Sequence, residues 1–143
     1  MGARMFMTAR FMETWSHSQA IYDLIGRERI YKDNIKNIVT IGVKTFAWTY
    51  LNRKLDVPSQ IPFVSLSSPS GIQWEWNETS TEESVKGLAS DFCHVVTQTR
   101  NIEDTDLELV GKVAKHWMSI AQCFAGDPED PPAKGLRKKQ NRG

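Results

Sequence analysis

Residues 63–76 read FVSLSSPSGIQWEW, and this stretch carries the pattern that decides the fold. Apolar and polar side chains alternate over 63–67 and again over 72–76, which predicts two short strands. The link between them, SPSG at 68–71, fits a hairpin turn in which Gly71 is free to adopt a positive φ. The sequence therefore predicts a β-hairpin near the middle of the chain.

Helical patterns lie on both sides of the hairpin. Apolar residues recur at steps of three or four over about 33–52, 87–99 and 111–124, and 107–110 is a further short strand candidate. Asp33 or Asn34 can cap the first of these helices. The mixture predicts an α+β fold, with a small α/β domain of one hairpin and three helices over residues 29–125.

A fourth helical pattern occupies residues 4–25 and ends before Gly26. Its apolar side chains surround the helix almost completely, which is typical of a helix buried among other helices. Left alone it would expose Phe6, Phe11, Met12 and Trp15, and such a patch favours self-association. We therefore expect a homodimer through this first helix.

The composition limits the classes of partner. The chain has 143 residues, with 18 Lys and Arg against 17 Asp and Glu, so a nucleic-acid partner is not expected from its charge. No apolar run reaches the length of about 18 residues that a membrane-spanning helix needs, and no signal-peptide pattern is present. Cys93 and Cys123 fit buried reduced thiols better than a disulfide. These features predict a cytoplasmic protein without a membrane partner.

Residues 126–143 form a tail rich in proline, glycine and basic residues, which predicts disorder. Its Lys and Arg side chains could contact phosphate or RNA, but a solvated tail is the simpler interpretation.

The strongest local signal for chemistry is Glu13 followed by His17. Side chains four residues apart share one face of a helix, so this carboxylate and this imidazole could bind one divalent metal ion. Zn²⁺ sites use such pairs together with ligands from elsewhere in the protein. The alternative is a Glu–His hydrogen bond without a metal.

His94 and His116 lack a second ligand-type residue one turn further on, so we expect both to be partly exposed helix residues. The serines of the hairpin have no nucleophile-elbow motif or evident base, and no glycine-rich phosphate loop is present. Arg100, at the end of a predicted helix, is the best polar candidate for substrate binding, and a surface arginine is its alternative. Trp74, Trp76 and Trp117 would line an apolar pocket or form ordinary core.

Four segments together resemble one protein superfamily. METWSHSQAIYDLIG at 12–26 is similar to the last bundle helix of the mycothiol-dependent maleylpyruvate isomerase superfamily, metal-binding proteins related to DinB. GIQWEWN at 71–77, VKGLASDFCHVVTQTRNIEDTDLEL at 85–109 and VGKVAKHWMSIAQCFAG at 110–126 resemble the C-terminal domain of an uncharacterised branch of that superfamily. The resemblance covers about residues 5–126.

The resemblance implies a four-helix metal-binding bundle followed by a sterol-carrier-like α/β domain. Residues 1–28 would then be the last helix of a truncated bundle. The family's Glu-x-x-x-His motif carries over to Glu13 and His17, while its other histidine ligand has no counterpart here. The glycine and aspartate that often follow the motif are replaced by Ser18 and Ala20.

The implied function is the C-terminal portion of a metal-dependent isomerase or transferase that uses a low-molecular-weight thiol and is inactive alone. Zn²⁺ would be the metal, and a small-molecule substrate or the thiol would be the partner. A non-catalytic module that binds a small molecule or a protein is one alternative. A role related to wybutosine formation in tRNA is another, which the near-neutral net charge does not favour.

Overall fold

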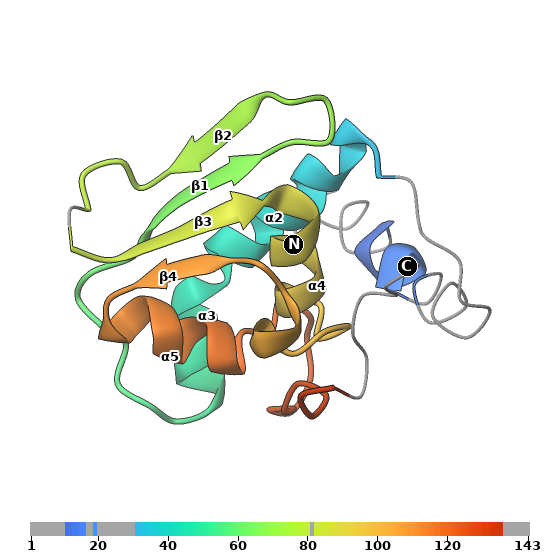
Figure 1. Ribbon diagram of the computed structural model, residues 1–143. Helices are drawn as coiled ribbons and strands as arrows, with labels where there is room; N and C mark the ends of the chain where they lie inside the picture. Colours follow the sequence, from blue (N-terminus) through green and yellow to red (C-terminus); the bar gives the residue numbers. More distant parts are fainter. Residues whose placement is uncertain (1–10, 17–18, 20–30, 81, 136–143) are drawn as a thin grey trace.

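The computed structural model describes residues 11–16, 19, 31–80 and 82–135 and shows an α+β fold (Figure 1). Residues 11–16 are helical. The elements that follow are η1 Asp33–Ile35, α2 Lys36–Lys44, α3 Phe46–Asn52, β1 Phe63–Ser67, β2 Gln73–Trp76, β3 Ser84–Leu88, α4 Ala89–Val96, η2 Ile102–Asp104, β4 Glu108–Val110 and α5 Lys112–Ile120. The predicted fold class is confirmed.

The strands form one mixed sheet in the order β2-β1-β3-β4. The predicted hairpin is present, with β1 antiparallel to β2 and Gly71 at a φ of 91° in the turn. On the other side β1 pairs in parallel with β3, and β3 pairs antiparallel with β4. The connection from β2 to β3 therefore passes from one side of β1 to the other.

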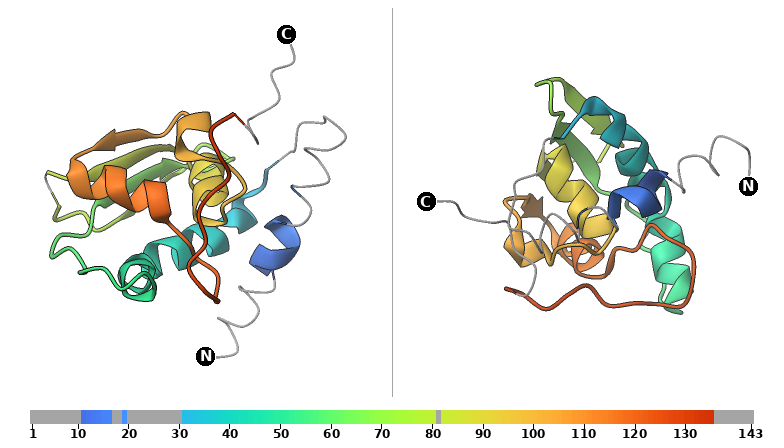
Figure 2. Two further views of the ribbon diagram at one scale, coloured as in Figure 1. Left: turned by 90° about the horizontal axis from the view of Figure 1, so that it is seen from below. Right: turned by 90° about the vertical axis from the view of Figure 1, so that its right-hand side faces the viewer.

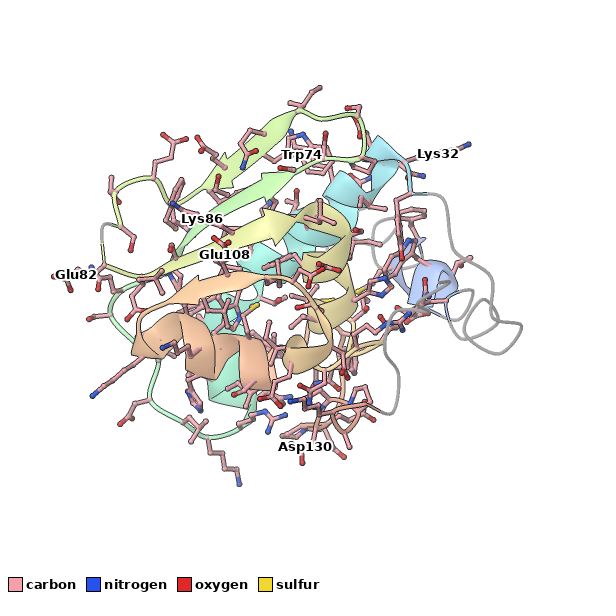
Figure 3. All side chains as sticks on the ribbon, in the orientation of Figure 1. Lys32, Trp74, Glu82, Lys86, Glu108 and Asp130 are labelled. Atoms are coloured by element: carbon pink, nitrogen blue, oxygen red, sulfur yellow. The ribbon has the colours of Figure 1, made fainter. Side chains whose placement is uncertain are left out.

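The two faces of the sheet differ in burial. Val64, Leu66, Trp74 and Val85 lie on the face that α2 and α4 cover, and all four are buried. The opposite face carries polar side chains, including the cross-strand neighbours Lys86 and Glu108 (Figure 3). Figures 1 and 2 show the helices gathered on one side of the sheet, with α5 beside the edge strand β4.

The helix predicted over 33–52 is in fact divided. Thr45 separates α2 from α3, and its hydroxyl donates to the carbonyls of Ile41 and Gly42 at 2.9 and 3.1 Å. Such back-bonding competes with the helical ladder and bends it. Asp33 does not cap its own helix, because its carboxylate accepts the backbone N–H and the hydroxyl of Ser70 in the hairpin turn.

The sequence pattern does not predict the strand β3. Its last two residues fall at the start of the helix predicted over 87–99, whereas α4 begins at Ala89. The last helix likewise ends at Ile120 rather than at 124, because Ala121 is extended and Cys123 N–H then donates to the carbonyl of Val96. The prediction of free, buried thiols is confirmed for Cys93 and Cys123.

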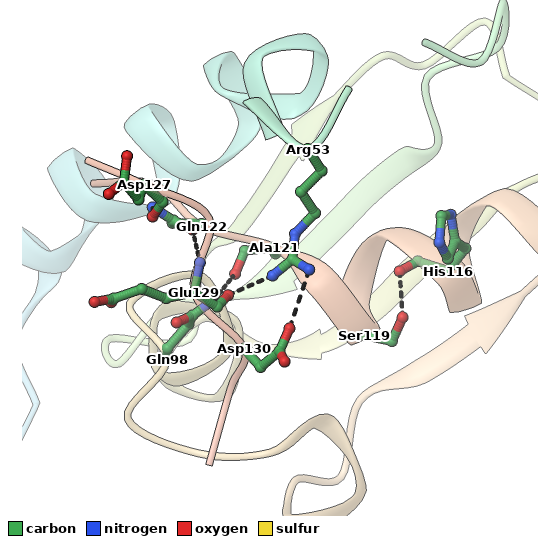
Figure 4. A network of polar contacts seen from close by, with 9 residues as sticks. All are labelled: Arg53, Gln98, His116, Ser119, Ala121, Gln122, Asp127, Glu129 and Asp130. Atoms are coloured by element: carbon green, nitrogen blue, oxygen red, sulfur yellow. Dashed lines mark hydrogen bonds and ion pairs between the residues drawn. The ribbon is translucent and has the colours of Figure 1, made fainter. Parts of the chain in front are cut away.

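Residues 126–135, which we call the strap, make hydrogen bonds to the domain, although the composition predicts disorder from residue 126 onward. Gln98 donates to the carbonyl of Glu129 at 2.8 Å, and Gln122 accepts the N–H of Glu129 at 2.9 Å (Figure 4). Arg53 pairs with Asp130 at 3.0 Å. These side chains satisfy the backbone of the strap and hold it against the domain. Residues 136–143 lie outside the described part of the chain.

Within that described part, no helix has both the length and the apolar character needed to span a bilayer.

Candidate functional site

A small polar site lies along α4, between its first turn and the turn that follows its end, and includes Tyr31. A pocket of about 30 Å³ is lined by Tyr31, Ser90, Asp91, His94, Arg100 and Asp104. That volume is roughly the space of one water molecule, so the pocket suits a small polar group rather than a whole metabolite. Its lining combines a phenol, an imidazole, a guanidinium and two carboxylates.

A helix C-cap places the pocket residues. Gln98 adopts a φ of 59°, and the N–H groups of Gln98 and Thr99 donate to the carbonyls of Val95 and His94. This is the Schellman arrangement, which normally uses glycine at the left-handed position. The Gln98 side chain donates to Ala121 and Glu129 carbonyls, which helps hold the strained backbone. The turn brings Thr99 and Arg100 back beside His94.

His94 is 4% exposed, so the prediction of a partly exposed histidine is wrong. Its Nδ1 lies 2.8 Å from the hydroxyl of Thr99, and its Nε2 lies 2.6 Å from the hydroxyl of Tyr31. Tyr31 is 63 positions away along the chain, so no sequence pattern near His94 indicates this contact. His116, by contrast, is exposed as predicted.

The contacts of His94 fit either neutral tautomer, because the Thr99 hydroxyl can donate to Nδ1 or to the carbonyl of His94. When it donates to that carbonyl, at 3.2 Å, it accepts the proton of Nδ1. Neutral imidazole has one donor nitrogen and one acceptor nitrogen. In that tautomer the acceptor is Nε2, which receives the O–H of Tyr31.

The first helix packs against two residues that line the pocket, Tyr31 and His94. Trp15 is buried, and its ring centroid lies 5.0 Å from that of His94 and 6.2 Å from that of Tyr31. Met12 is also buried, with its sulfur 2.9 Å from Sγ of Cys123, whose pKa is raised by burial. Met12 and Trp15 therefore pack within the chain, which corrects the expectation that the helix leaves them exposed for a dimer. Phe11 is half-buried, and Phe6 lies outside the described residues.

Arg100 is 4% exposed, so its alternative as a surface arginine is wrong. Its Nη1 donates to the carbonyl of Thr99 at 2.9 Å, and its side chain lines the pocket. Asp91 accepts the N–H of Asp106 at 3.2 Å, and Asp104 accepts the N–H of Gly135 at 2.8 Å. The guanidinium and the two carboxylates therefore lie around one small space.

Glu13, one of the two predicted metal ligands, is not part of this pocket. Glu13 is exposed on the helix whose Met12 and Trp15 are buried, so its carboxylate does not face the α/β domain. His17 lies outside the described residues. Among the residues that are described, no group of three His, Cys, Asp or Glu side chains is arranged to hold a metal ion.

Trp74, Trp76 and Trp117, the tryptophans predicted to line a pocket, do not lie in the pocket that Arg100 lines. Trp74 is buried against the covered face of the sheet, and Lys36 Nζ lies 5.4 Å from its ring centroid. Trp76 is half-buried beside the same core. Trp117 is fully buried, with Phe46 and Phe92 edge-on at 5.0 and 5.8 Å. None of the three lines the pocket at Arg100, and none lines a second, more open pocket formed by residues of η2, β4 and α5.

Comparisons with known proteins give two similar sequences. The uncharacterised proteins MT0041 of Mycobacterium tuberculosis (strain CDC 1551 / Oshkosh) and Rv0036c of Mycobacterium tuberculosis (strain ATCC 25618 / H37Rv) are each 37% identical over 135 residues, which is 94% of this chain. The chain spans about half the length of these relatives, at 51% of each. No protein-family model matches the chain. No solved structure matches it either.

Proposed function

We propose that this chain is the C-terminal portion of a metal-dependent, thiol-dependent isomerase or transferase, with Glu13 and His17 as ligands of a divalent cation such as Zn²⁺. The observation that carries the proposal is that the first helix has one buried face and one exposed face. Met12 and Trp15 anchor the helix to the α/β domain, while Glu13 is exposed on the same helical turn. A carboxylate in this position is accessible to ligands supplied by further helices.

The described residues provide too few ligands to hold such a metal tightly, because Glu13 is the one member of the predicted pair among them. We therefore assign no catalytic step to a metal. The mycobacterial relatives are about twice as long as the matched region, so each has further sequence that could carry the remaining ligands. In this proposal the intact protein acts in the cytoplasm on a small molecule.

Zinc binding tests this proposal. We expect the purified chain to bind one Zn²⁺ weakly in competition with a chromophoric chelator. Glu13→Gln and His17→Ala should each weaken binding by about tenfold or more, the range found when single supporting groups of a metal site are removed. Glu78→Gln, a change at another exposed glutamate, is the matched control and should have no effect. Absence of binding, or equal binding in all four proteins, would contradict the proposal.

The pocket at Arg100 favours a second candidate, a non-catalytic module that binds a small organic anion. A buried guanidinium is suited to a carboxylate or phosphate group. Trp15 packs against His94, which lines this pocket, so a ligand should change tryptophan fluorescence. Titration with small carboxylates in the presence of a chelator tests this candidate: Arg100→Gln should abolish the change, whereas a signal that persists in that variant would exclude Arg100 as the binding group.

A further inference from the structure

Tyr31, His94 and Thr99 form a hydrogen-bonded series that neither candidate function uses. Tyr31 Oη lies 2.6 Å from Nε2 of His94, and Nδ1 of His94 lies 2.8 Å from Oγ1 of Thr99. A nucleophile within reach of a base, with the base oriented by a third group, is the general arrangement of activated nucleophiles. The half-buried Tyr31 also lines the pocket, so its hydroxyl lies beside space that a ligand group can enter.

We propose that Tyr31 is a reactive phenol with His94 as its base and Thr99 as the group that orients the imidazole, and that the site takes small electrophiles carrying an anionic group. This inference is independent of the proposed metal, since Glu13 is not part of the pocket.

The proposal requires the tautomer of His94 that carries its proton on Nδ1. With that proton directed to Thr99, the lone pair of Nε2 faces Tyr31 and can accept the phenol proton. Trp15 packs against the imidazole at 5.0 Å and restricts its rotation. The imidazolium that forms would lie in a pocket whose lining includes the carboxylates of Asp91 and Asp104, and opposite charge stabilises it.

Arg100 is the cationic residue of the pocket lining and would bind the anionic end of the ligand, whereas Asp91 and Asp104 carry the opposite charge. The pocket, at about 30 Å³, admits one end of a ligand rather than the whole molecule. In an acyl transfer, Tyr31 Oη would form a bond to the acyl carbon while the bond to the leaving group breaks. The phenol proton passes to Nε2 of His94 and from there to the leaving group, so the step needs no oxidant or further reactant.

The probe 4-(fluorosulfonyl)benzoate, which carries a carboxylate and an electrophilic sulfur, tests the inference on the whole chain. Attack by Tyr31 forms the oxygen–sulfur bond, fluoride leaves, and the proton passes through His94 to water. Peptide mapping should find Tyr31 labelled, with Tyr50 unlabelled because that residue is buried. Benzenesulfonyl fluoride, the neutral analogue, should label Tyr31 more slowly in the wild type and at a similar rate to the anionic probe in Arg100→Gln.

Substitutions test whether the labelling of Tyr31 depends on His94 and Thr99 rather than on the folded structure in general. His94→Gln should slow labelling of Tyr31 by about a hundredfold, within the range of general-base contributions. Thr99→Val should slow it less, and Thr49→Val, the same change at a buried hydroxyl elsewhere, should leave it unchanged. Equal labelling of Tyr31 in wild type and His94→Gln would overturn the inference.

A measurement without substitution covers the case in which His94→Gln fails to fold. Nitrogen-15 NMR of the wild-type chain should show His94 with a protonated Nδ1 and an unprotonated Nε2. A proton on Nε2 at neutral pH would remove the base from Tyr31 and overturn the inference. Labelling that survives in Glu13→Gln, in the presence of a chelator, would separate this site from the proposed metal centre.

Discussion

Gly111 and Glu83 meet at the start of α5, where each restricts the other. Glu83 is buried, and its carboxylate accepts the N–H groups of Val113 and Ala114 at 3.2 and 2.9 Å. These are orphan donors of the first helical turn, which a negative charge stabilises. Gly111 has a φ of 94°, and a Cβ at this position would lie 2.1 Å from Oε2 of Glu83. Both the positive φ and the closeness of the Glu83 carboxylate therefore require glycine at position 111.

We predict that Gly111→Ala lowers the free energy of unfolding by about 3 kcal/mol or more, since backbone strain alone costs about 1–3 kcal/mol and the methyl group also displaces the Glu83 carboxylate. Urea denaturation measures the loss. Gly71→Ala is the matched control, because Gly71 has a φ of 91° but no atom within 4 Å of the added Cβ. Equal losses in the two variants would show that Glu83 plays no part.

Tyr50 gives a prediction for alkaline pH. Burial raises its pKa to about 12, and the charge of Glu83 adds to this effect. The unfolded chain ionises tyrosine near pH 10, so the folded state retains a proton that the unfolded state loses. Stability is therefore full below about pH 10 and falls by on the order of 2–3 kcal/mol as the pH rises through 12.

Within the described residues the Tyr50 hydroxyl is buried without a hydrogen-bond partner, so removing it should cost little. We predict that Tyr50→Phe unfolds at the same or a higher urea concentration at pH 7. It should also lose less stability than the wild type between pH 10 and 12. Parallel losses in both proteins over that interval would assign the alkaline transition to other groups.

Gly42 determines how closely two helices approach. It lies on α2 where that helix packs against α4, and a Cβ there would lie 2.9 Å from Phe92 and 3.0 Å from Val96. Phe92 and Val96 are both buried in the core, so neither side chain has space to move. The short helix–helix distance therefore depends on the absence of a side chain at this position.

Gly42→Ala should destabilise the protein by about 1–3 kcal/mol through overpacking, although alanine gains up to about 1 kcal/mol in helix propensity. Asn37→Ala, on the exposed side of the same helix, isolates the propensity term and should stabilise slightly. Thermal unfolding of the two variants measures both effects. A stabilising effect of Gly42→Ala would mean that α2 and α4 separate easily.

The range of the contacts within each helix or strand explains which of these elements the sequence pattern could predict. The hairpin is local, because its alternation and its SPSG turn lie within 14 consecutive residues, 63–76. The strand β3 has one strongly apolar inward residue, Val85, and depends on backbone pairing with β1 and β4. Pairing partners distant in sequence leave no periodic signal in the strand itself. The sequence pattern therefore does not reveal β3, and the helix that it predicts from residue 87 begins two residues before α4.

For the molecule as a whole, Gln122 is the residue that joins the strap to the domain. It is 2% exposed; its Nε2 donates to the carbonyls of Phe124 and Asp127, and its Oε1 accepts the N–H of Glu129. The ion pair of Arg53 with Asp130 lies at the surface, where the Asp130 side chain is 87% exposed. Buried hydrogen bonds contribute more to stability than exposed ion pairs. Gln122 should therefore contribute more than the Arg53–Asp130 pair to holding the strap on the domain (Figure 4).

We predict that Gln122→Ala costs about 2–4 kcal/mol, since it breaks three hydrogen bonds and leaves buried backbone groups unpaired. It should also accelerate hydrogen exchange throughout residues 126–135. Asp130→Ala is the comparison variant and should cost at most about 1 kcal/mol. Exchange in the strap that is unchanged by Gln122→Ala would contradict this account.

The sequence by itself determined the fold class, the hairpin, the approximate helices and the two buried thiols, because each depends on periodicity or composition within a short segment. Only the tertiary structure decided the site. It buried His94 and Arg100, joined Tyr31 to His94 across 63 positions, packed Trp15 against both rings and held the strap in place. Contacts between residues far apart in the chain depend on how the elements pack together, and no local pattern encodes that packing.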